Sequence, residues 1–484
     1  MKFKSNRIVA VLLSVITIIS AIPITVSAEE ADLKISTLSE FQQFAADVNN
    51  GNTYEGKTVV LNADIALGGE SSPWTPIGNE TNRFKGTFNG ENHVVSGLFI
   101  SDGSGKNLGL FGYVENGAVE SLTVKGSVYG SGNVAGIVGY LSEGNVINCG
   151  NNADVTGSSA VAGVVGYVGG ASSVSGCYNS GSVTGTTGYI GGVTGQHWRA
   201  GSVENCYNTG VITGPATVGG VAGGHKAASP ALTNCYNAGM VIDSAGNSNN
   251  IGAVIGASRG TNSGCFYLKG TGTDTKDGIT ETEILDADIL GSGFKSDDDN
   301  LNGGYPILAW QIKIPDLIIG SYEELKAFAD SVNEGNTYEG KLIRLDVNVY
   351  LGGSSNPWTP AGTSASPFKG IFDGNYHIVS GLYINGGSSL GFFGAVDGGI
   401  IRNLVVSGSV TGSGDIAGIA GKLTAGKIIN CGNEASISGS ANVGGIVGSI
   451  NGDCTVSGCY NSGSVSGTTG YIGGVTGQHW RAGS

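Results

Sequence analysis

The chain has 484 residues, and its 38 acidic against 24 basic side chains give it a formal net charge of −14. This sign argues against nucleic acid and against anionic membrane surfaces as partners. Its 87 glycines, ten prolines and 40% hydrophobic residues exclude a collagen-like chain, a disordered stalk and an ordinary α/β enzyme. They favour short strands joined by many tight turns.

The N-terminal segment 1–28 has the pattern of an export signal. Lys2, Lys4 and Arg7 form a basic start, residues 8–26 are apolar, and Ala28 closes a small-residue cleavage site. Loss of these three bases changes the net charge of the mature chain to −17. No cysteine marks a lipid anchor here, and no later stretch is long and apolar enough to span a membrane. The sequence therefore predicts export by a Sec-type signal peptide to the extracellular space or the cell surface, without membrane insertion.

Two segments have the pattern of an amphipathic helix. Each opens with a capping box, Thr37-Leu-Ser-Glu40 in one and Ser321-Tyr-Glu-Glu324 in the other. Apolar side chains then recur at the helical period, namely Leu38, Phe41, Phe44, Ala45 and Val48, and Tyr322, Leu325, Phe328, Ala329 and Val332. Because each segment precedes a region of short repeats, we expect each helix to cover the end of that region.

A repeat of about 28 residues, a period typical of solenoid proteins, dominates the rest of the sequence. The motif small-Gly-apolar-x-Gly occurs at residues 135–139, 162–166, 191–195 and 219–223, and a looser version occurs at 252–256. An Asn-Cys or Cys-Tyr-Asn element follows each motif, and a third short apolar element closes the unit. One such unit cannot bury its own apolar face, so the units must stack. The pattern predicts an all-β fold, a right-handed parallel β-helix whose coils lie about 4.8 Å apart.

The cysteines occupy one slot of this repeat. The slot holds Leu122, Cys149, Cys177, Cys206, Cys235 and Cys265 in the first copy, and Leu404, Cys431 and Cys459 in the second. Because leucine fills the same slot, we expect an inward column of buried thiols. A disulfide is the weaker alternative, since stacked Cβ atoms stay about 4.8 Å apart, against about 3.8 Å in a disulfide. No Cys-x-x-Cys or Cys/His cluster indicates a metal. Cys454 lies off the column and has no predicted role. The asparagines two residues after the slot are expected to form a column of stacked amides.

The repeat region occurs twice in tandem. Residues 51–57 return at 335–341, and residues 185–202 return unchanged at 467–484. We expect residues 29–270 to form the first β-helix with its N-terminal cap. Residues 271–313 are expected to form a C-terminal cap and linker, with an acidic, partly helical stretch over 281–290. Residues 314–484 are expected to form the second copy. Because the sequence stops in the middle of a coil, we expect a fragment of a longer, monomeric chain.

The Gly-Gly-Val-x-Gly and Asn-Cys-Tyr-Asn elements, with the entry segment 84–98 that returns at 368–382, resemble those of the GLUG-motif proteins of bacterial cell surfaces. The resemblance covers most of residues 35–270 and 319–484. It implies β-helix repeats like those of adhesins and of the non-catalytic part of secreted immunoglobulin A peptidases. Such repeats occur beside other surface modules.

The sequence carries little sign of catalysis. None of the five histidines begins a His-Glu-x-x-His motif, and no Gly-x-Ser-x-Gly elbow lies in a strand-turn-helix context, although a Ser-His-Asp arrangement stays open. Glycoside hydrolysis needs two converging carboxylates. The acids of the first repeat region share no slot; they are Glu115, Glu120, Glu143, Asp154, Glu204 and Asp243. We therefore expect no enzyme.

One segment resembles the start of a calcium-binding loop. Asp298, Asn300, Asn302 and Gly303 have the spacing of an EF-hand, but Ala309 stands where that loop needs a glutamate. No cofactor is expected, and a structural calcium ion in an oxygen-rich cap is the alternative.

One edge of the repeat carries unusual side chains. The loop after the first strand of successive coils holds His197, Trp198 and Arg199, then His225 and Lys226, then Arg259; the second copy repeats His479, Trp480 and Arg481. Insertions on one edge of a solenoid often form its binding face. Tryptophan beside cations suits a sugar or an anionic glycan. The alternative is that these residues only shield and solubilise the edge.

These observations favour a non-catalytic extracellular module for adhesion, surface display, or binding of a host or environmental glycan or protein. Two alternatives remain open from the sequence. One is a β-helix polysaccharide lyase or hydrolase, and the other is the stalk of a larger secreted metallopeptidase.

Overall fold

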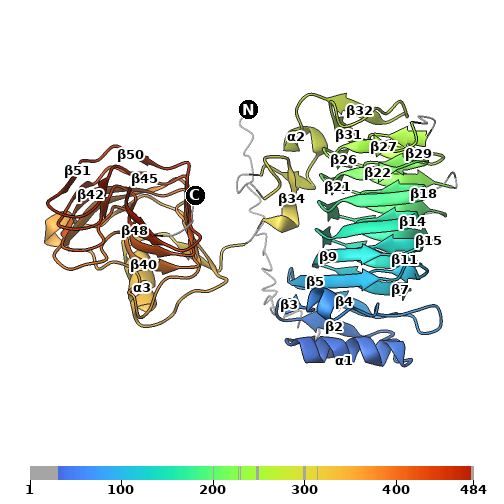
Figure 1. The fold of residues 1–484 in the computed structure, drawn as a ribbon, viewed down its shortest axis with the longest axis horizontal. Coiled ribbons are helices and arrows are strands. Elements are labelled where there is room, and N and C mark those ends of the chain that lie inside the picture. Colours follow the sequence, from blue (N-terminus) through green and yellow to red (C-terminus); the bar gives the residue numbers. More distant parts are fainter. Residues whose placement is uncertain are drawn as a thin grey trace, which may run out of the picture. The chain divides into compact units, whose positions relative to one another are not determined.

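The computed structural model describes residues 31–480, except 200, 227, 229–230, 247–249, 298–300 and 313. The predicted signal peptide and Arg481 therefore lie outside the described residues. The chain divides into two compact units, residues 1–312 and 313–484, and each is a parallel β-solenoid (Figure 1). The predicted parallel β-helix, with one sequence repeat in each coil, is confirmed.

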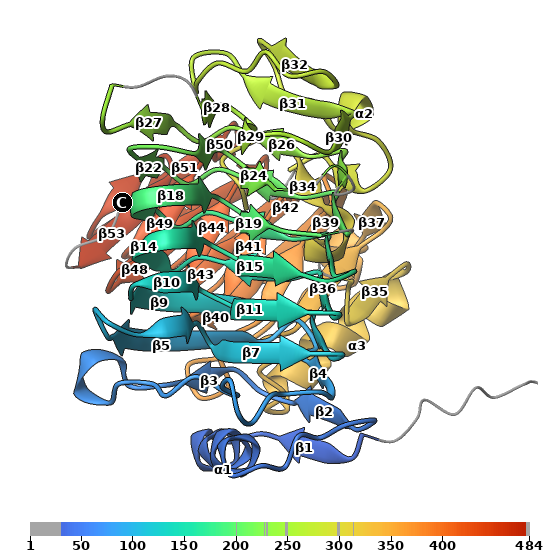
Figure 2. The ribbon, with the colours of Figure 1, turned by 90° about the vertical axis from the view of Figure 1, so that its right-hand side faces the viewer.

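The first unit consists of three parallel sheets that run along the stack of coils. Sheet 1 contains β1 (Leu33–Ile35), β2 (Thr58–Leu61), β4 (Thr87–Asn89), β8 (Ala118–Glu120), β12 (Asn145–Ile147), β16 (Ser173–Ser175), β20 (Ser202–Glu204), β25 (Ala231–Thr233) and β30 (Thr261–Ser263). Sheet 3 contains β7 (Phe111–Glu115), β11 (Val138–Ser142), β15 (Val165–Gly169), β19 (Thr194–His197), β24 (Ala222–His225) and β29 (Ile255–Ala257). Figure 2 shows the strands of sheet 3 stacked one above the next.

Sheet 2 is the longest sheet and joins the other two in each coil. It contains β3 (Ile65–Ala66), β5 (Val94–Ser101), β6 (Lys106–Leu108), β9 (Thr123–Tyr129), β10 (Gly132–Ala135), β13 (Gly150–Asn151), β14 (Asp154–Ala162), β17 (Tyr178–Asn179), β18 (Val183–Gly191), β21 (Tyr207–Asn208), β22 (Ile212–Gly214), β23 (Val218–Gly219), β26 (Tyr236–Asn237), β27 (Val241–Asp243), β28 (Ile251–Gly252), β31 (Cys265–Leu268) and β32 (Ile279–Thr282).

The core forms because equivalent residues of successive coils pair in register. In sheet 1, Val119 pairs with Val146, Val146 with Val174, and Val174 with Val203. All four are fully buried. Each coil thus buries an aliphatic side chain that a single coil would leave in water, and this burial favours stacking.

The cysteine slot lies inside this core, immediately after a tight corner. The residue before the slot has a positive φ in every coil, for example 54° at Ser121, 53° at Asn148 and 61° at Gly176. Asparagine and glycine adopt this conformation at low cost, which explains their repeated use there. The slot residue follows, and its side chain is fully buried in each of these coils of the first unit: Leu122, Cys149, Cys177, Cys206, Cys235 and Cys265. All these cysteines are free thiols, and so are the second unit's Cys431, which is buried, and Cys459, which is partly exposed.

The asparagines after this slot form a hydrogen-bonded column. The Nδ2 atom of Asn151 donates to Oδ1 of Asn179 at 2.7 Å, and Asn179 donates likewise to Asn208. Asn208 donates to Oδ1 of Asn237 at 2.8 Å. Each amide also donates to the carbonyl two residues later, so the buried side chains are satisfied within the protein.

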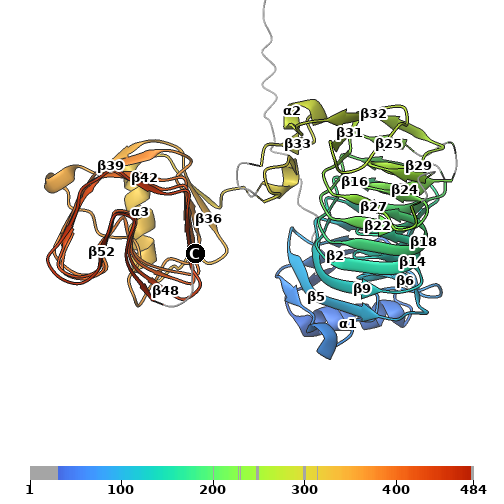
Figure 3. The ribbon, with the colours of Figure 1, turned by 45° about the horizontal axis from the view of Figure 1, so that its top comes forward.

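A helix covers one end of each solenoid. Helix α1 (Leu38–Asn49) begins at the capping box of Thr37 and Glu40, and its Phe41 and Phe44 rings pack against Phe88 of the next coils. Helix α3 (Tyr322–Asn333) covers the end of the second unit, where its Phe328 ring contacts Phe372. Figure 3 looks along the coils of the second unit and shows α3 within their outline. Among the described residues, no helix is long and apolar enough to cross a membrane.

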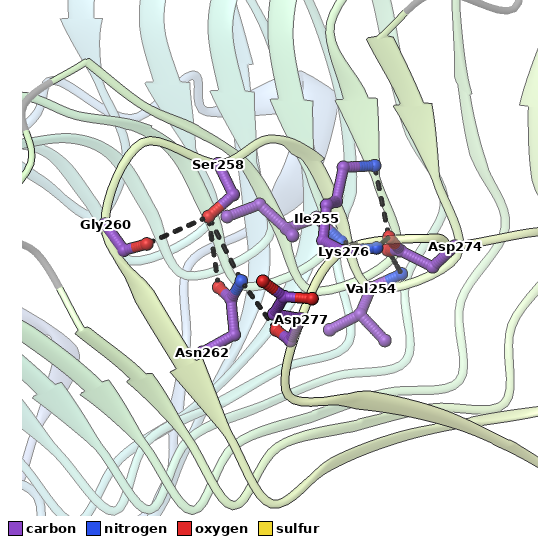
Figure 4. Close-up of polar contacts among 8 residues, drawn as sticks. All are labelled: Val254, Ile255, Ser258, Gly260, Asn262, Asp274, Lys276 and Asp277. Atoms are coloured by element: carbon purple, nitrogen blue, oxygen red, sulfur yellow. Dashed lines mark hydrogen bonds and ion pairs between the residues drawn. The ribbon is translucent and has the colours of Figure 1, made fainter.

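The opposite end of the first unit is closed by a carboxylate. The fully buried side chain of Asp274 accepts hydrogen bonds from the backbone N–H groups of Val254 and Ile255, each at 3.1 Å, and pairs with Lys276 (Figure 4). In the preceding coil the equivalent N–H groups donate to a carbonyl of the next coil. Asp274 therefore replaces the coil that would otherwise follow, and it satisfies the exposed edge.

The segment that follows lies along the side of the solenoid and not across its end. It includes α2 (Ala287–Leu290) and the antiparallel pair β33 (Phe294–Lys295) and β34 (Ile307–Leu308), followed by the 3-10 turn η3 (Ala309–Gln311) (Figure 1). Leu290, Phe294 and Leu308 pack on the stacked rings of Tyr178, Tyr207 and Tyr236. Of the acidic stretch over 281–290 that we expected to be partly helical, only the four residues of α2 are helical, because Thr280 and Glu281 pair with the last coil.

The second unit repeats this architecture over fewer coils. One sheet contains β35 (Leu317–Ile319), β36 (Leu342–Leu345), β38 (Ile371–Asp373), β41 (Ile400–Arg402), β44 (Lys427–Ile429) and β49 (Thr455–Ser457). A second contains β37 (Val349–Tyr350), β39 (Ile378–Asn385), β42 (Val405–Gly412), β45 (Gly432–Asn433), β46 (Ser436–Gly439), β50 (Tyr460–Asn461) and β51 (Val465–Gly467). The counterpart of sheet 3 contains β40 (Phe393–Asp397), β43 (Ala420–Thr424), β48 (Val447–Asn451) and β53 (Thr476–Trp480), and β47 (Val443–Gly444) pairs with β52 (Ile472–Gly473). Cys454 is buried in this core.

Candidate functional site

A stack of tyrosines lies on sheet 3 of the first unit. Tyr113, Tyr140 and Tyr167 occupy the same position of β7, β11 and β15, and their ring centroids are 4.5 and 4.6 Å apart. Burial, together with the neighbouring Tyr140, raises the pKa of both Tyr113 and Tyr167 to about 12, so these phenols stay neutral and act as hydrogen-bonding groups. This column was not predicted from the sequence, although a Gly-Tyr pair marks each member, at 112–113, 139–140 and 166–167.

One end of the tyrosine stack is covered by an ion pair. The Arg83 guanidinium lies 4.7 Å from the centre of the Tyr113 ring and pairs with the Glu115 carboxylate. Lys85 approaches the same carboxylate at 3.4 Å. Arg83, Lys85 and Glu115 thus form a small ion-pair cluster beside the tyrosine stack.

Trp198 and Lys226 meet beyond the other end of the stack. The Lys226 ammonium lies 4.7 Å from the centre of the Trp198 ring and 5.2 Å from that of Tyr189. The Lys226 backbone N–H donates to the His197 carbonyl at 2.9 Å, which fixes one loop on the next. Trp198 keeps 41% of its surface exposed. Both residues were predicted at this edge from the sequence, and the structure places them in contact.

The two histidines of the predicted edge are not on its surface. His197 and His225 are 0% and 1% exposed, so the prediction that they line an exposed edge is wrong. Each is the last residue of its strand and continues the inward column of Leu141 and Val168, and the loop begins only at the next residue. Burial lowers the pKa of His197 to about 3, with a contribution from His225, and lowers that of His225 to about 4. Within the described part of the chain, neither ring nitrogen of either histidine has a hydrogen-bond partner.

The remaining residues of the predicted edge follow the same strand ends. Arg199 and Arg259 are exposed after β19 and β29. In the second unit His479 and Trp480 end β53, and Trp480 is 60% exposed. Arg481 lies outside the described residues.

The second unit has no tyrosine stack on its counterpart of sheet 3. Ala395, Lys422 and Ser449 stand in one column there, at the position that the tyrosines hold in the first unit. A hollow of about 400 Å³ lies beside Lys422 and Ser449 of this column. It is lined by Asp415, Lys422, Asn442, Ser449, Ile450, Asn451, Gln478 and Trp480. The two units therefore share the tryptophan edge but differ in the surface beside it.

The described residues contain no group of three or more His, Cys, Asp and Glu side chains that could hold a metal ion. Asp298 and Asn300 of the calcium-like segment lie outside the described residues. The loop around them is organised by Asp297, whose carboxylate accepts from the backbone N–H groups of Leu301, Asn302 and Gly304.

Comparison with known proteins identifies the repeat. Residues 186–213 match the family model of the GLUG motif. The chain contains the GLUG motif. The matched segment includes β19, Trp198 and Arg199, whereas Lys226 and the tyrosine stack lie outside it.

Two individual proteins are similar to parts of the chain. A protein named "Putative Gly-rich membrane protein" from Evansella cellulosilytica is 39% identical over 89 residues, which are 17% of this chain. The chain spans only 10% of that relative's length. The crystal structure of a putative immunoglobulin A1 protease from Bacteroides ovatus is similar at a TM-score of 0.45 and 18% identity. That similarity covers 57% of this chain and 92% of the other.

Proposed function

We propose that this chain is a non-catalytic extracellular module that serves adhesion or surface display by binding glycans at its tryptophan edge. The observation that carries the proposal is the half-exposed Trp198 ring, which Lys226 holds in place from the next coil. An indole face packs against the apolar face of a sugar ring, and a cation beside it binds sugar oxygens or acidic groups. Packing of the edge on a rigid solenoid limits the entropy lost on binding.

A glycan array probed with the full chain tests this proposal. The variant Trp198→Ala/Trp480→Ala removes both exposed rings, and we expect it to lose the glycan signals of the unchanged chain. Tyr350→Ala is the matched control, because Tyr350 is 68% exposed on a strand away from the edge. Unchanged signals from the double tryptophan variant would refute the proposal.

We also propose that the module acts outside the cell. The basic and apolar pattern of residues 1–28 supports export. Expression of the full chain in a Gram-positive host, followed by N-terminal sequencing of the secreted protein, tests this. A mature chain beginning at Glu29 is the expected result, and retention of the intact chain in the cytoplasm is the contrary one.

A further inference from the structure

Three cations follow the strands of sheet 3 in three successive coils of the first unit. Arg199 follows β19, Lys226 follows β24 and Arg259 follows β29, and all three are exposed. Counted from the paired registers, Trp198, Lys226 and Arg259 stand at one position of successive coils about 4.8 Å apart, and Arg199 follows Trp198 by one residue. We call Arg199, Lys226 and Arg259 the cationic row.

The cationic row has no carboxylate partner among the described residues, whereas many other cations of this acidic chain do. Lys269 pairs with Glu283, and Lys326 pairs with Asp330. Lys226 instead contacts two aromatic rings, and the charge of Arg199 acts on the Tyr167 phenol. In a protein with a net charge of −14, three exposed cations that pair with no carboxylate of the described residues give this edge a local affinity for an anion.

Resting on the proposed glycan binding, we propose that the ligand of this edge is an anionic polysaccharide, bound through its carboxylate or sulfate groups by the cationic row. Its sugar rings pack on Trp198. Lys226 and Arg259 share one column along the coil axis, and Arg199 lies one position beside it, so a polymer whose charge repeats along its length can bring successive anionic groups to these cations.

Binding of the immobilised full chain to four polymers tests the inference. The probes are polygalacturonate, dextran sulfate, uncharged dextran and single-stranded polyadenylate. We expect binding to at least one of the two acidic glycans that weakens as salt is raised, and little binding to uncharged dextran or polyadenylate. The first two probes distinguish a carboxylated from a sulfated ligand.

The variant Arg199→Gln/Lys226→Gln/Arg259→Gln removes the cationic row, and we expect at least about tenfold weaker binding to the acidic glycan. Lys269→Gln/Lys326→Gln/Lys341→Gln is the control, because it changes the net charge equally at exposed lysines that have carboxylate partners. We expect the control to bind within about twofold of the unchanged chain.

The outcomes separate this inference from the proposed function. Binding to uncharged dextran that the cationic-row variant does not alter would overturn the inference and leave glycan binding standing. Equal binding of polyadenylate and the acidic glycans would also overturn it, because charge alone would then explain the affinity. No binding to any glycan here or on the array would overturn both.

Discussion

The buried histidine pair makes the first unit sensitive to acid. His197 and His225 lie in adjacent coils with their ring centroids 5.5 Å apart, and their four ring nitrogens have no hydrogen-bond partner among the residues that the structure describes. Leu141 stands two coils before His197 in the same inward column, so leucine is compatible with this position. We predict that His197→Leu/His225→Leu abolishes most of the acid sensitivity of the first unit.

The magnitude follows from the lowered pKa values. In the folded state His197 stays neutral down to about pH 3 and His225 down to about pH 4. In the unfolded chain both bind protons below their ordinary pKa of 6.5. The unfolded state therefore binds more protons between these limits, and the stability falls as the pH falls. Each histidine contributes about 1.4 kcal/mol per pH unit in this window. The two together cost about 4 kcal/mol at pH 5 relative to pH 8.

Urea denaturation of the full chain at pH 8, 6 and 5 measures this effect. Because both substitutions lie in the first unit, the difference between the denaturation curves of the variant and of the unchanged chain reports on the stability of that unit. At pH 8 the leucine variant is expected to be at least as stable, since each unsatisfied buried polar group costs about 1–3 kcal/mol. His93→Gln/His377→Gln is the control, because those side chains are not fully buried. The same loss of stability between pH 8 and 5 in the leucine variant and the unchanged chain would refute the reasoning.

Three further predictions concern the end of the first unit, the tryptophan edges and the thiols. Asp274→Ala removes a charged acceptor of two backbone N–H groups, so we expect the free energy of unfolding to fall by about 3 kcal/mol and those two amides to exchange hydrogen faster. Unchanged exchange would contradict the capping role. Trp198→Ala is expected to weaken binding of a short oligosaccharide more than Trp480→Ala does, because Lys226 lies beside Trp198; calorimetry on each single variant measures this, and equal losses would contradict a role for that cation. Cys459 is expected to react first with iodoacetamide at pH 7.5, because a hydrogen bond from Cys431 lowers its pKa to about 7. Burial raises the pKa of Cys177 and protects that thiol, and mass spectrometry of the alkylated chain would show the order of reaction.

The fold could be predicted from the sequence because each coil places the same kind of residue at the same point. The in-register valines of sheet 1 and the Leu122 to Cys265 slot both recur once in each coil, and stacking permits no other register for them. The lateral path of residues 285–311 could not be predicted, since it depends on the stacked rings of Tyr178, Tyr207 and Tyr236. Each of these tyrosines stands between an inward cysteine and an inward asparagine, so the sequence alone assigns its side chain to the solvent-facing side of the coil.

The candidate site was only partly predictable for a related reason. The pairing of Trp198 with Lys226 follows from equivalent positions in successive coils, which the sequence supplies. The burial of His197 depends on where β19 ends, and a shift of one residue moves a side chain from the surface to the core. The spacing of apolar residues does not show where β19 ends. His197 follows three strand residues, so it could be either the last inward residue of the strand or the first residue of the loop.

The two units separate what the fold requires from what it tolerates. Most columns that face inward are apolar in both units, while the tyrosine position of sheet 3 becomes Ala395, Lys422 and Ser449 in the second unit without a change of architecture. Packing therefore imposes little on that outer column, and a side chain there is free to differ. Trp198 is more exposed than that column, at 41% of its surface, yet residues 185–202 and 467–484 are identical. Since core packing does not require an exposed indole at either place, a surface role for the edge accounts for its presence in both units better than stability does.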